Sequence, residues 1–217
     1  MRINSYLAQA TGLSRRRADD LIKQGRVELN GKTAQLGASV AEDSQVKLDG
    51  RSLGLKPMTT IMFNKPVGYV VSRKGQGAET IYSLLPNEFA NLKPIGRLDK
   101  DSSGLLLLTN DGQLSESLTH PGKQKDKVYE VSLDIPIRKV DLEQLDKGVE
   151  LEDGPSKLRI TGVTHGGRSM NVVISEGRNR QIRRSFAALG YRIESLHRIQ
   201  VGKYMLGKLR PGQWVKL

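Results

Sequence analysis

The spacing of apolar residues divides the chain into a short N-terminal part and a longer part of mixed helices and strands. Residues 4–12 and 14–25 carry apolar side chains at helical spacing, and each stretch begins at a residue that can cap a helix and ends at glycine. These caps and terminators are Asn4, Ser5, Gly12, Ser14 and Gly25. An alternating run at 26–29 then leads to Asn30-Gly31, a strong signal for a tight hairpin with a return strand at 32–34.

A further short strand is expected at 45–48, which completes a small helix-and-hairpin module over residues 1–50. Residues 51–58 contain glycine and proline, and they predict a linker. From residue 59 to 217 the pattern predicts strands and helices without a regular alternation, which favours a mixed or antiparallel sheet. The fold class is therefore α+β. The expected strands are 60–64, 104–109, 127–133, 157–164, 170–175 and 193–201, and the expected helices are 79–85, 112–120, 137–147 and 179–189.

One strand is distinguished by a continuous apolar run. Four leucines at 105–108 follow Gly104 and end before Asn-Asp-Gly, a pattern typical of a buried central strand. The polar loop just before it contains Asp99 and Asp101 between basic neighbours. A carboxylate on a loop held by a rigid buried strand is well placed for chemistry, and this makes Asp99 a candidate. For Asp101 we favour a turn-capping or solvated role.

A second candidate segment, residues 175–184, is rich in arginine. Asn179 can cap a helix whose Ile182, Phe186 and Leu189 share one apolar face. At 100° per residue, three arginines of this segment fall on a different face, where one can hold a carboxylate while its neighbours meet phosphates. They are Arg180, Arg183 and Arg184. A solvated basic face is the alternative interpretation.

Charge and composition narrow the function classes. The 217 residues include 35 Lys and Arg against 23 Asp and Glu, a formal charge of +12, and residues 1–57 share in this excess. Such a balance favours a polyanionic partner. The absence of cysteine excludes disulfides, thiolate metal sites and cysteine nucleophiles, and three scattered histidines give no metal-ligand spacing. No stretch approaches the roughly 18 apolar residues of a membrane span, so we expect a soluble cytoplasmic protein that binds no membrane and no metal.

Three motifs together carry a family resemblance. The segments at 96–104 (Gly-Arg-Leu-Asp-Lys-Asp-Ser-Ser-Gly), 127–129 (Lys-Val-Tyr) and 176–184 (Glu-Gly-Arg-Asn-Arg-Gln-Ile-Arg-Arg) resemble, in order and spacing, the motif set of RsuA-type ribosomal RNA pseudouridine synthases. Residues 64–68 resemble that family's opening strand and loop. Residues 1–50 resemble the small RNA-binding module first seen in a protein of the small ribosomal subunit.

The resemblance implies an enzyme that detaches uracil from its ribose, turns it and rejoins it through carbon-5 without a cofactor. It implies that Asp99 is the catalytic aspartate, which either attacks the sugar C1′ or takes a proton from C2′. Tyr129 would stack on the target base and assist proton transfer, and Arg183 would pair with the aspartate. Ile182 would line the pocket, and Arg97 would occupy the space of the extruded nucleotide. The residues expected to contact RNA are Arg2, Arg15, Arg16, Arg17, Lys23, Lys65, Arg178, Arg180 and Arg184.

Several choices remain open from the sequence. The triplet Asn179-Arg180-Gln181 resembles the large-subunit branch of the family more than the small-subunit enzyme. The expected partner is ribosomal RNA or a pre-ribosomal particle, bound by a monomer. The alternatives are a small-subunit enzyme, a non-catalytic ribosome-binding or assembly factor that retains the fold, and an RNA-binding regulator that uses only the N-terminal module.

Overall fold

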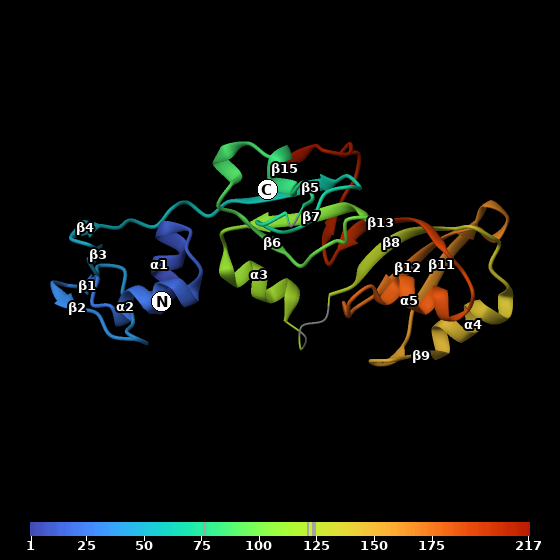
Figure 1. The fold of residues 1–217 in the computed structure, drawn as a ribbon, viewed down its shortest axis with the longest axis horizontal. Helices are drawn as coiled ribbons and strands as arrows, with labels where there is room; N and C mark the ends of the chain where they lie inside the picture. The colour runs from blue at the N-terminus through green and yellow to red at the C-terminus, as the bar shows by residue number, and fades with distance from the viewer. Residues whose placement is uncertain (76, 121, 123–124) are drawn as a thin grey trace. The chain divides into compact units, whose positions relative to one another are not determined.

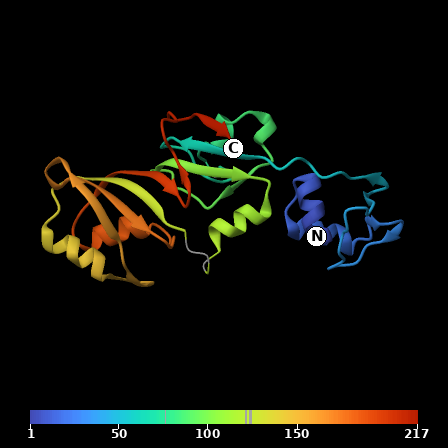
Figure 2. The ribbon, with the colours of Figure 1, turned by 180° about the vertical axis from the view of Figure 1, so that it is seen from behind.

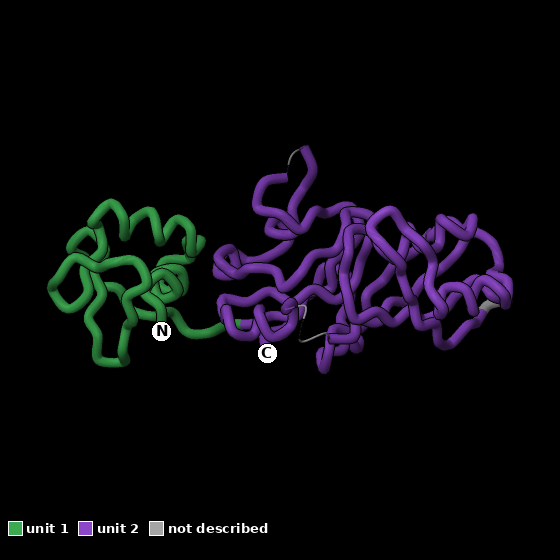
Figure 3. The backbone as a smooth tube through the Cα atoms, turned by 90° about the horizontal axis from the view of Figure 1, so that it is seen from below, with its two compact units in different colours: residues 1–59 green, residues 60–217 purple. Residues whose placement is uncertain are grey.

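The computed structural model describes residues 1–217 except positions 76, 121, 123 and 124. The chain forms two compact units, residues 1–59 and residues 60–217 (Figure 3). Each unit has its own apolar core. We refer to them as the N-terminal unit and the C-terminal unit.

The N-terminal unit consists of two helices and a small antiparallel sheet of strand order β2-β1-β3-β4. The elements are α1 (Ile3–Thr11), α2 (Arg15–Lys23), β1 (Val27–Leu29), β2 (Lys32–Thr33), β3 (Val46–Leu48) and β4 (Arg51–Ser52). Ser14 caps α2 by accepting a hydrogen bond from the backbone N–H of Arg17, as expected. Asn30 and Gly31 both adopt positive φ, 51° and 76°, as a two-residue hairpin turn requires.

The start of α1 and the proposed linker differ from the sequence expectation. Helix α1 begins at Ile3 with Arg2 at its N-cap position, and no side chain caps it. The Asn4 side chain instead donates a hydrogen bond to Asp19 of α2, so Asn4 joins the two helices rather than capping one. The expected linker also contains β4, because Arg51 and Ser52 pair with β3.

The C-terminal unit is built on one mixed sheet of strand order β11-β12-β8-β13-β7-β5-β15, with β14 on β13 and β6 on β7. Strand β13 runs parallel to β7, and the neighbouring pairs are antiparallel. Figures 1 and 2 show α4 and α5 on the same side of β8, β11 and β12. The strands are β5 (Thr60–Lys65), β6 (Lys93–Ile95), β7 (Ser103–Thr109), β8 (Lys127–Leu133), β9 (Val149–Leu151), β10 (Gly154–Ser156), β11 (Arg159–Thr164), β12 (Ser169–Ile174), β13 (Ile193–Val201), β14 (Tyr204–Met205) and β15 (Trp214–Lys216). The helices are α3 (Gly112–Thr119), α4 (Lys139–Lys147) and α5 (Gln181–Ala188), with 3-10 turns at Ile81–Leu84, Asn87–Phe89 and His165–Gly167.

Strand β7 is buried on both faces, as its leucine run predicts. Leu106 and Leu108 pack in the larger core with residues of β5, whereas Leu105 and Leu107 pack in a second cluster on the other face. Each of the four leucines is at most 1% exposed. Its neighbours β5 and β13 lie on either side of it in the sheet. This strand therefore provides a rigid base for the loop that precedes it.

Two expected helices are shorter than their patterns suggest. Residues 79–85 form only a 3-10 turn at Ile81–Leu84, capped by the side chain of Thr80. The helix expected at 179–189 begins at Gln181, because Arg180 has a left-handed backbone with φ of 46°. Asn179 consequently precedes the helix without capping it, and Leu189 follows its end. The β9–β10 hairpin was not expected from the sequence.

Candidate active site

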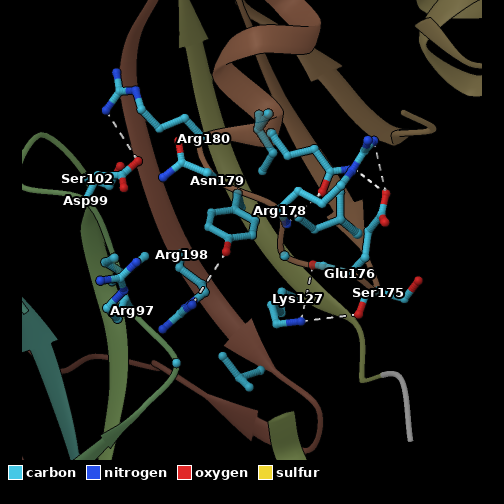
Figure 4. Close-up of a pocket in the computed structure, with 18 of the residues that line it drawn as sticks. Arg97, Asp99, Ser102, Lys127, Ser175, Glu176, Arg178, Asn179, Arg180 and Arg198 are labelled. Carbon is cyan, nitrogen blue, oxygen red and sulfur yellow. Dashed lines mark hydrogen bonds and ion pairs between the residues drawn. The ribbon is translucent and has the colours of Figure 1, made fainter. Parts of the chain in front are cut away.

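A cavity of about 630 Å³ lies in the C-terminal unit. Its walls come from the loop before β7, the start of β8, the segment between β12 and α5, and β13. Figure 4 shows Arg97 and Asp99 on one side and Lys127 and Glu176 on the other, with Arg198 between them. The volume lies within the range of roughly 300–1,000 Å³ that is usual for sites that bind small ligands. The cavity thus brings together segments that lie far apart in the sequence.

Hydrogen bonds connect the loop that carries Asp99 to the end of β5 and to the segment that follows it. The buried ammonium of Lys65, at the end of β5, donates hydrogen bonds of 2.7 Å to the Ser102 carbonyl and 3.0 Å to the Pro66 carbonyl. The Gly68 N–H donates to the Lys100 carbonyl at 2.7 Å. These bonds hold the carbonyls of Lys100 and Ser102, which follow Asp99 in its turn.

Lys65 is not the RNA contact that the sequence analysis predicted. It is 0% exposed, so its ammonium cannot reach a phosphate outside the protein. Burial lowers the pKa of Lys65 to about 8, although the nearby charges of Asp101 and Asp99 oppose this shift. Lys65 therefore acts inside the fold, where its charge and its three donors support the acidic loop.

Arg180 is the ion-pair partner of Asp99. Its Nη1 lies 3.4 Å from Asp99 Oδ2, and its two terminal nitrogens each lie 3.1 Å from a different oxygen of Asp101 (Figure 4 shows the contact with Asp99). The Asp99 side chain is 35% exposed, which leaves it accessible to a ligand in the cavity. The left-handed conformation of Arg180 immediately before α5 turns the chain at this point.

The expected pairing of Arg183 with Asp99 is replaced by a contact with the next acidic residue. Arg183 donates to the Asp101 carbonyl at 2.9 Å, and its Nε lies 3.4 Å from the Asp101 carboxylate. The hydrogen bond from Arg180, helped by the charge of Arg183, holds the pKa of Asp101 below its usual value. Asp101 is exposed, as expected for a solvated group, and it also anchors Arg180 and Arg183. The pairing differs from the expectation because Arg180, which precedes α5, forms the ion pair with Asp99.

Tyr129 and Ile182 line the same cavity, as the resemblance implies. Both are buried, at 8% and 4% exposure, and they come from β8 and α5. The Tyr129 hydroxyl lies 3.5 Å from Nη1 of Arg198, an arginine of β13 that is 3% exposed. The Nε of Arg198 donates to the Leu105 carbonyl at 2.8 Å.

Arg198 was missed by sequence reasoning. The available signal was an arginine inside the apolar strand pattern of 193–201, where a charged residue is costly unless it is used. Gly104 fixes the position of Arg198. A Cβ at Gly104 would lie 2.2 Å from the Arg198 carbonyl oxygen and 2.5 Å from its amide nitrogen, and φ at Gly104 is 105°. Only glycine allows β7 and β13 to approach this closely.

Two further arginines of the predicted RNA set are held by an internal contact. Arg184 forms a two-pronged ion pair with Asp153 in the turn between β9 and β10. Arg178 donates to the Asp153 carboxylate and to carbonyls of the same turn, at Asp153, Gly154 and Pro155. The structure thus shows Arg178 and Arg184 fastening the β9–β10 hairpin to α5, and Arg180 holding the acidic loop. The sequence analysis did not predict these contacts of Arg178 and Arg184, because it did not predict the hairpin to which they bind.

The remaining predicted basic residues are exposed. In the N-terminal unit they are Arg2, Arg15, Arg16, Arg17 and Lys23. Arg17 lies 4.0 Å from Asp20, and Arg2 donates to the Gly37 carbonyl. Arg97 is exposed and lines the cavity close to Asp99 (Figure 4). These side chains remain accessible to a phosphate backbone.

The described residues contain no group of three or more His, Asp or Glu side chains placed to hold a metal ion. None of the helices in the described ranges has the length and apolar character needed to span a bilayer.

Comparison with known families assigns both parts of the chain. Residues 59–188 match the family model described as RNA pseudouridylate synthase, and residues 1–51 match the S4 domain. The second match covers the helix-and-hairpin module of the N-terminal unit. The first covers the loop of Asp99, β8 with Tyr129, and α5.

Individual relatives align with the whole chain. An "Uncharacterized RNA pseudouridine synthase" of Aquifex aeolicus (strain VF5) is 36% identical over 100% of this chain and 90% of its own length. The "Ribosomal large subunit pseudouridine synthase B" of Yersinia pestis is 35% identical over 100% of this chain and 72% of its own length. The protein of that name from Bacillus subtilis (strain 168) is 34% identical over 97% and 89%. A solved structure titled "Crystal structure of pseudouridylate synthase" superposes with a TM-score of 0.72 at 31% identity and covers 100% of this chain and 96% of its own. The resemblance drawn from the motifs is confirmed: the chain belongs to the RNA pseudouridylate synthase family and carries an N-terminal S4 domain.

Proposed function

We propose that this protein converts uridine to pseudouridine in the ribosomal RNA of the large subunit. The observation that carries the proposal is Asp99, which is partly exposed beside Arg180 in a cavity of nucleotide size that Tyr129 also lines. The full-length relatives named for the large ribosomal subunit support the choice of RNA. The triplet Asn179-Arg180-Gln181, which resembles the large-subunit branch of the family, also supports this choice.

The reaction exchanges one bond of the base for another. The bond between N1 of uracil and C1′ of ribose breaks, the base turns within the site, and C5 then bonds to C1′ and loses its proton. A uridine stacked in RNA cannot reach a carboxylate inside a cavity, so the nucleotide must first leave its stack, at a cost of a few kcal/mol. The side chain of Arg97, exposed at the cavity close to Asp99, is placed to fill the vacated space.

We assign the chemical step to Asp99. Its carboxylate either attacks C1′ or removes a proton from C2′, and both roles need an oxygen exposed to the ligand and held in position. The loop contacts of Lys65 and the ion pair with Arg180 meet the second requirement. Tyr129 provides a ring for stacking on the base and a hydroxyl for proton transfer. Arg183 contributes by anchoring Asp101, and Ile182 closes the apolar wall.

We further propose that residues 1–50 act as an RNA-binding module, and residues 59–217 as the catalytic domain of a cytoplasmic monomer. The module offers an exposed basic face on α2, formed by Arg15, Arg16 and Lys23. The partner is ribosomal RNA, either free or in a precursor particle. Light scattering of the purified protein with and without RNA would measure the oligomeric state.

The Asp99→Asn variant tests the proposed function. It keeps the size of the side chain but removes the negative charge that makes Asp99 a nucleophile or base, so we expect no detectable tritium release from RNA labelled at carbon-5 of uridine. RNA affinity should stay within a few-fold. Asp126→Asn, which alters an exposed carboxylate paired with Arg159, is the matched control and should keep wild-type turnover.

Retained turnover in Asp99→Asn would refute the assignment of Asp99. A wild-type protein that binds ribosomal RNA but releases no tritium would favour the non-catalytic assembly factor instead. Mapping of pseudouridines in both ribosomal RNAs, from cells with and without the protein, would then identify the target. A site lost from the small-subunit RNA would contradict the choice of the large subunit.

A further inference from the structure

Arg198 places an uncompensated positive charge in the cavity wall. Its side chain is 3% exposed and is held by the Leu105 carbonyl through Nε and by contact of Nη1 with the Tyr129 hydroxyl. Its Nη2 is buried and has no hydrogen-bond partner among the described residues. Figure 4 shows the guanidinium between the side of the cavity that carries Asp99 and the side that carries Lys127.

A second cation, Lys127, adds to this charge, and the cavity wall also carries the carboxylates of Asp99 and Glu176. Burial, together with the charge of Arg198, lowers the pKa of Lys127, which lines the same cavity and donates to the carbonyls of Ser175 and Glu176. A guanidinium does not lose its proton in a protein. A buried charge without a partner is costly, and such a group is retained where a ligand supplies the opposite charge. The position of Arg198 therefore calls for an anion inside the cavity.

The reaction of the proposed function generates such an anion. When the N1–C1′ bond breaks, its electron pair remains with the base and leaves uracil with one negative charge, shared by N1 and the two carbonyl oxygens. The sugar is balanced in one of two ways: C1′ gains a bond to an Asp99 oxygen, or C2′ gives a proton to Asp99. Later, C5 bonds to C1′ with electrons of the base. In the first route the bond from C1′ to Asp99 breaks at this step, and in the second route Asp99 returns its proton to C2′. The proton on C5 is then released, and N1 gains a proton.

We propose that Arg198 is a catalytic residue that stabilises the detached uracil anion, with Nη2 donating a hydrogen bond to a carbonyl oxygen of the base. The proposal rests on the proposed function and extends it to a residue outside the aspartate's own ion pairs. Two nearby arginines are committed elsewhere, Arg180 to Asp99 and Asp101, and Arg183 to Asp101. Arg198 also contacts Tyr129, so the anion and the stacking ring are held by one side chain.

The test compares two substrates in each variant. RNA with 5-fluorouridine at the target position gives a less basic uracil leaving group, which needs less help from a cation. Single-turnover rates would be measured for wild type, Arg198→Lys and Arg198→Met, with loss of the intact nucleoside followed by mass spectrometry of nuclease digests. Removal of a donor to a developing anion costs about 100- to 1,000-fold in rate. We expect a loss of that order for Arg198→Met on uridine, and a loss at least tenfold smaller on 5-fluorouridine.

Arg198→Lys keeps the charge and should fall between wild type and Arg198→Met on uridine. For each variant, the rate on uridine is compared with the rate of the same variant on 5-fluorouridine. Arg198→Lys alone can therefore test the proposal if Arg198→Met does not fold. Arg159→Met, on the exposed strand β11, is the control and should match wild type on both substrates. Equal losses on the two substrates would show a merely structural role and overturn the proposal. So would weaker RNA binding with an unchanged chemical step, which indicates a phosphate contact. Failure of the wild type on uridine would instead contradict the proposed function.

Discussion

Lys65 illustrates how a single buried charge can define the geometry of this site. Its ammonium lies beneath the turn of Asp99, with hydrogen bonds to two carbonyls and no exposure to solvent. The two nearby carboxylates, Asp99 and Asp101, favour its charged form, whereas burial disfavours it, and burial dominates. The folded protein therefore binds this proton less tightly than the unfolded chain does.

That difference predicts how stability depends on pH. The pKa of Lys65 is about 8 in the folded protein against a usual value of 10.5. Between these two values the unfolded chain carries a proton that the folded protein lacks, so the free energy of unfolding should rise with pH through this window. Urea denaturation of wild type and Lys65→Met at pH 8, 9 and 10 would isolate the effect, since the other titrating groups are common to both. A difference between the two proteins that stays constant with pH would contradict it.

Residues that belong to a recognisable sequence motif could be predicted. Residues whose role depends on contacts with distant parts of the chain could not. Asp99 and Tyr129 lie in the cavity as expected. Lys65 was assigned to RNA, and nothing in the neighbouring sequence reveals that its side chain is buried at the end of β5. Arg198 was overlooked because its partner groups, Tyr129 and Leu105, come from other strands.

Strands β7 and β13 show how two elements distant in the chain build one site. They pair in parallel over a short register, His197 with Ser103 and Arg198 with Gly104. The loop of Asp99 enters at the start of β7, and Arg198 projects from β13 at the same level. The relative position of the aspartate and the arginine therefore depends on this close approach.

Gly104→Ala tests that dependence. The new methyl group would lie 2.2 Å from a backbone oxygen of β13, and φ of 105° is unfavourable for alanine, so neither strand can relax cheaply. We expect a loss of several kcal/mol in the free energy of unfolding, as for other severe overpacking, measured by thermal and urea denaturation. Gly54→Ala is the control, because a Cβ there meets no atom within 4 Å. A stable and active Gly104→Ala protein would show that the strands have more freedom than we infer.

Some helices and strands could be predicted from the spacing of apolar residues, and others could not. The four-leucine run of β7 and the alternation of β8 are strong signals, and both strands form where expected. Helix α5 starts two residues late because Arg180 takes a left-handed conformation and turns toward the acidic loop, a tertiary preference that no helical pattern contains. The β9–β10 hairpin is short, and arginines of the α5 segment bind its turn.

The whole molecule consists of two units with separate cores, and the exposed basic residues of the N-terminal unit are available for RNA. Several arginines of the C-terminal unit, by contrast, are occupied by Asp99, Asp101 and Asp153. These paired arginines are therefore less available to RNA phosphates than the exposed, unpaired basic side chains are.

Replacement of Arg15 and Arg16 by alanine should weaken RNA binding and flatten its dependence on salt, by a slope of roughly one per lost phosphate contact. Both side chains are exposed on α2, so the fold of the module should be unaffected. Filter-binding titrations at several salt concentrations, with Lys56→Ala as a control outside this helix, would measure the slope. An unchanged slope would exclude this face of α2 from the interface.

The buried contact of Lys65 also has a consequence for how such proteins diverge. Lys65 and Arg183 donate to carbonyls of the loop that carries Asp101, and loss of either donor would leave a loop carbonyl without this partner. Among descendants of a common ancestor, these positions should therefore be inherited as a group, with exchanges occurring together or not at all. Arg15 and Arg16 are exposed, and the fold does not depend on them in this way, so each can be replaced without a change at the other.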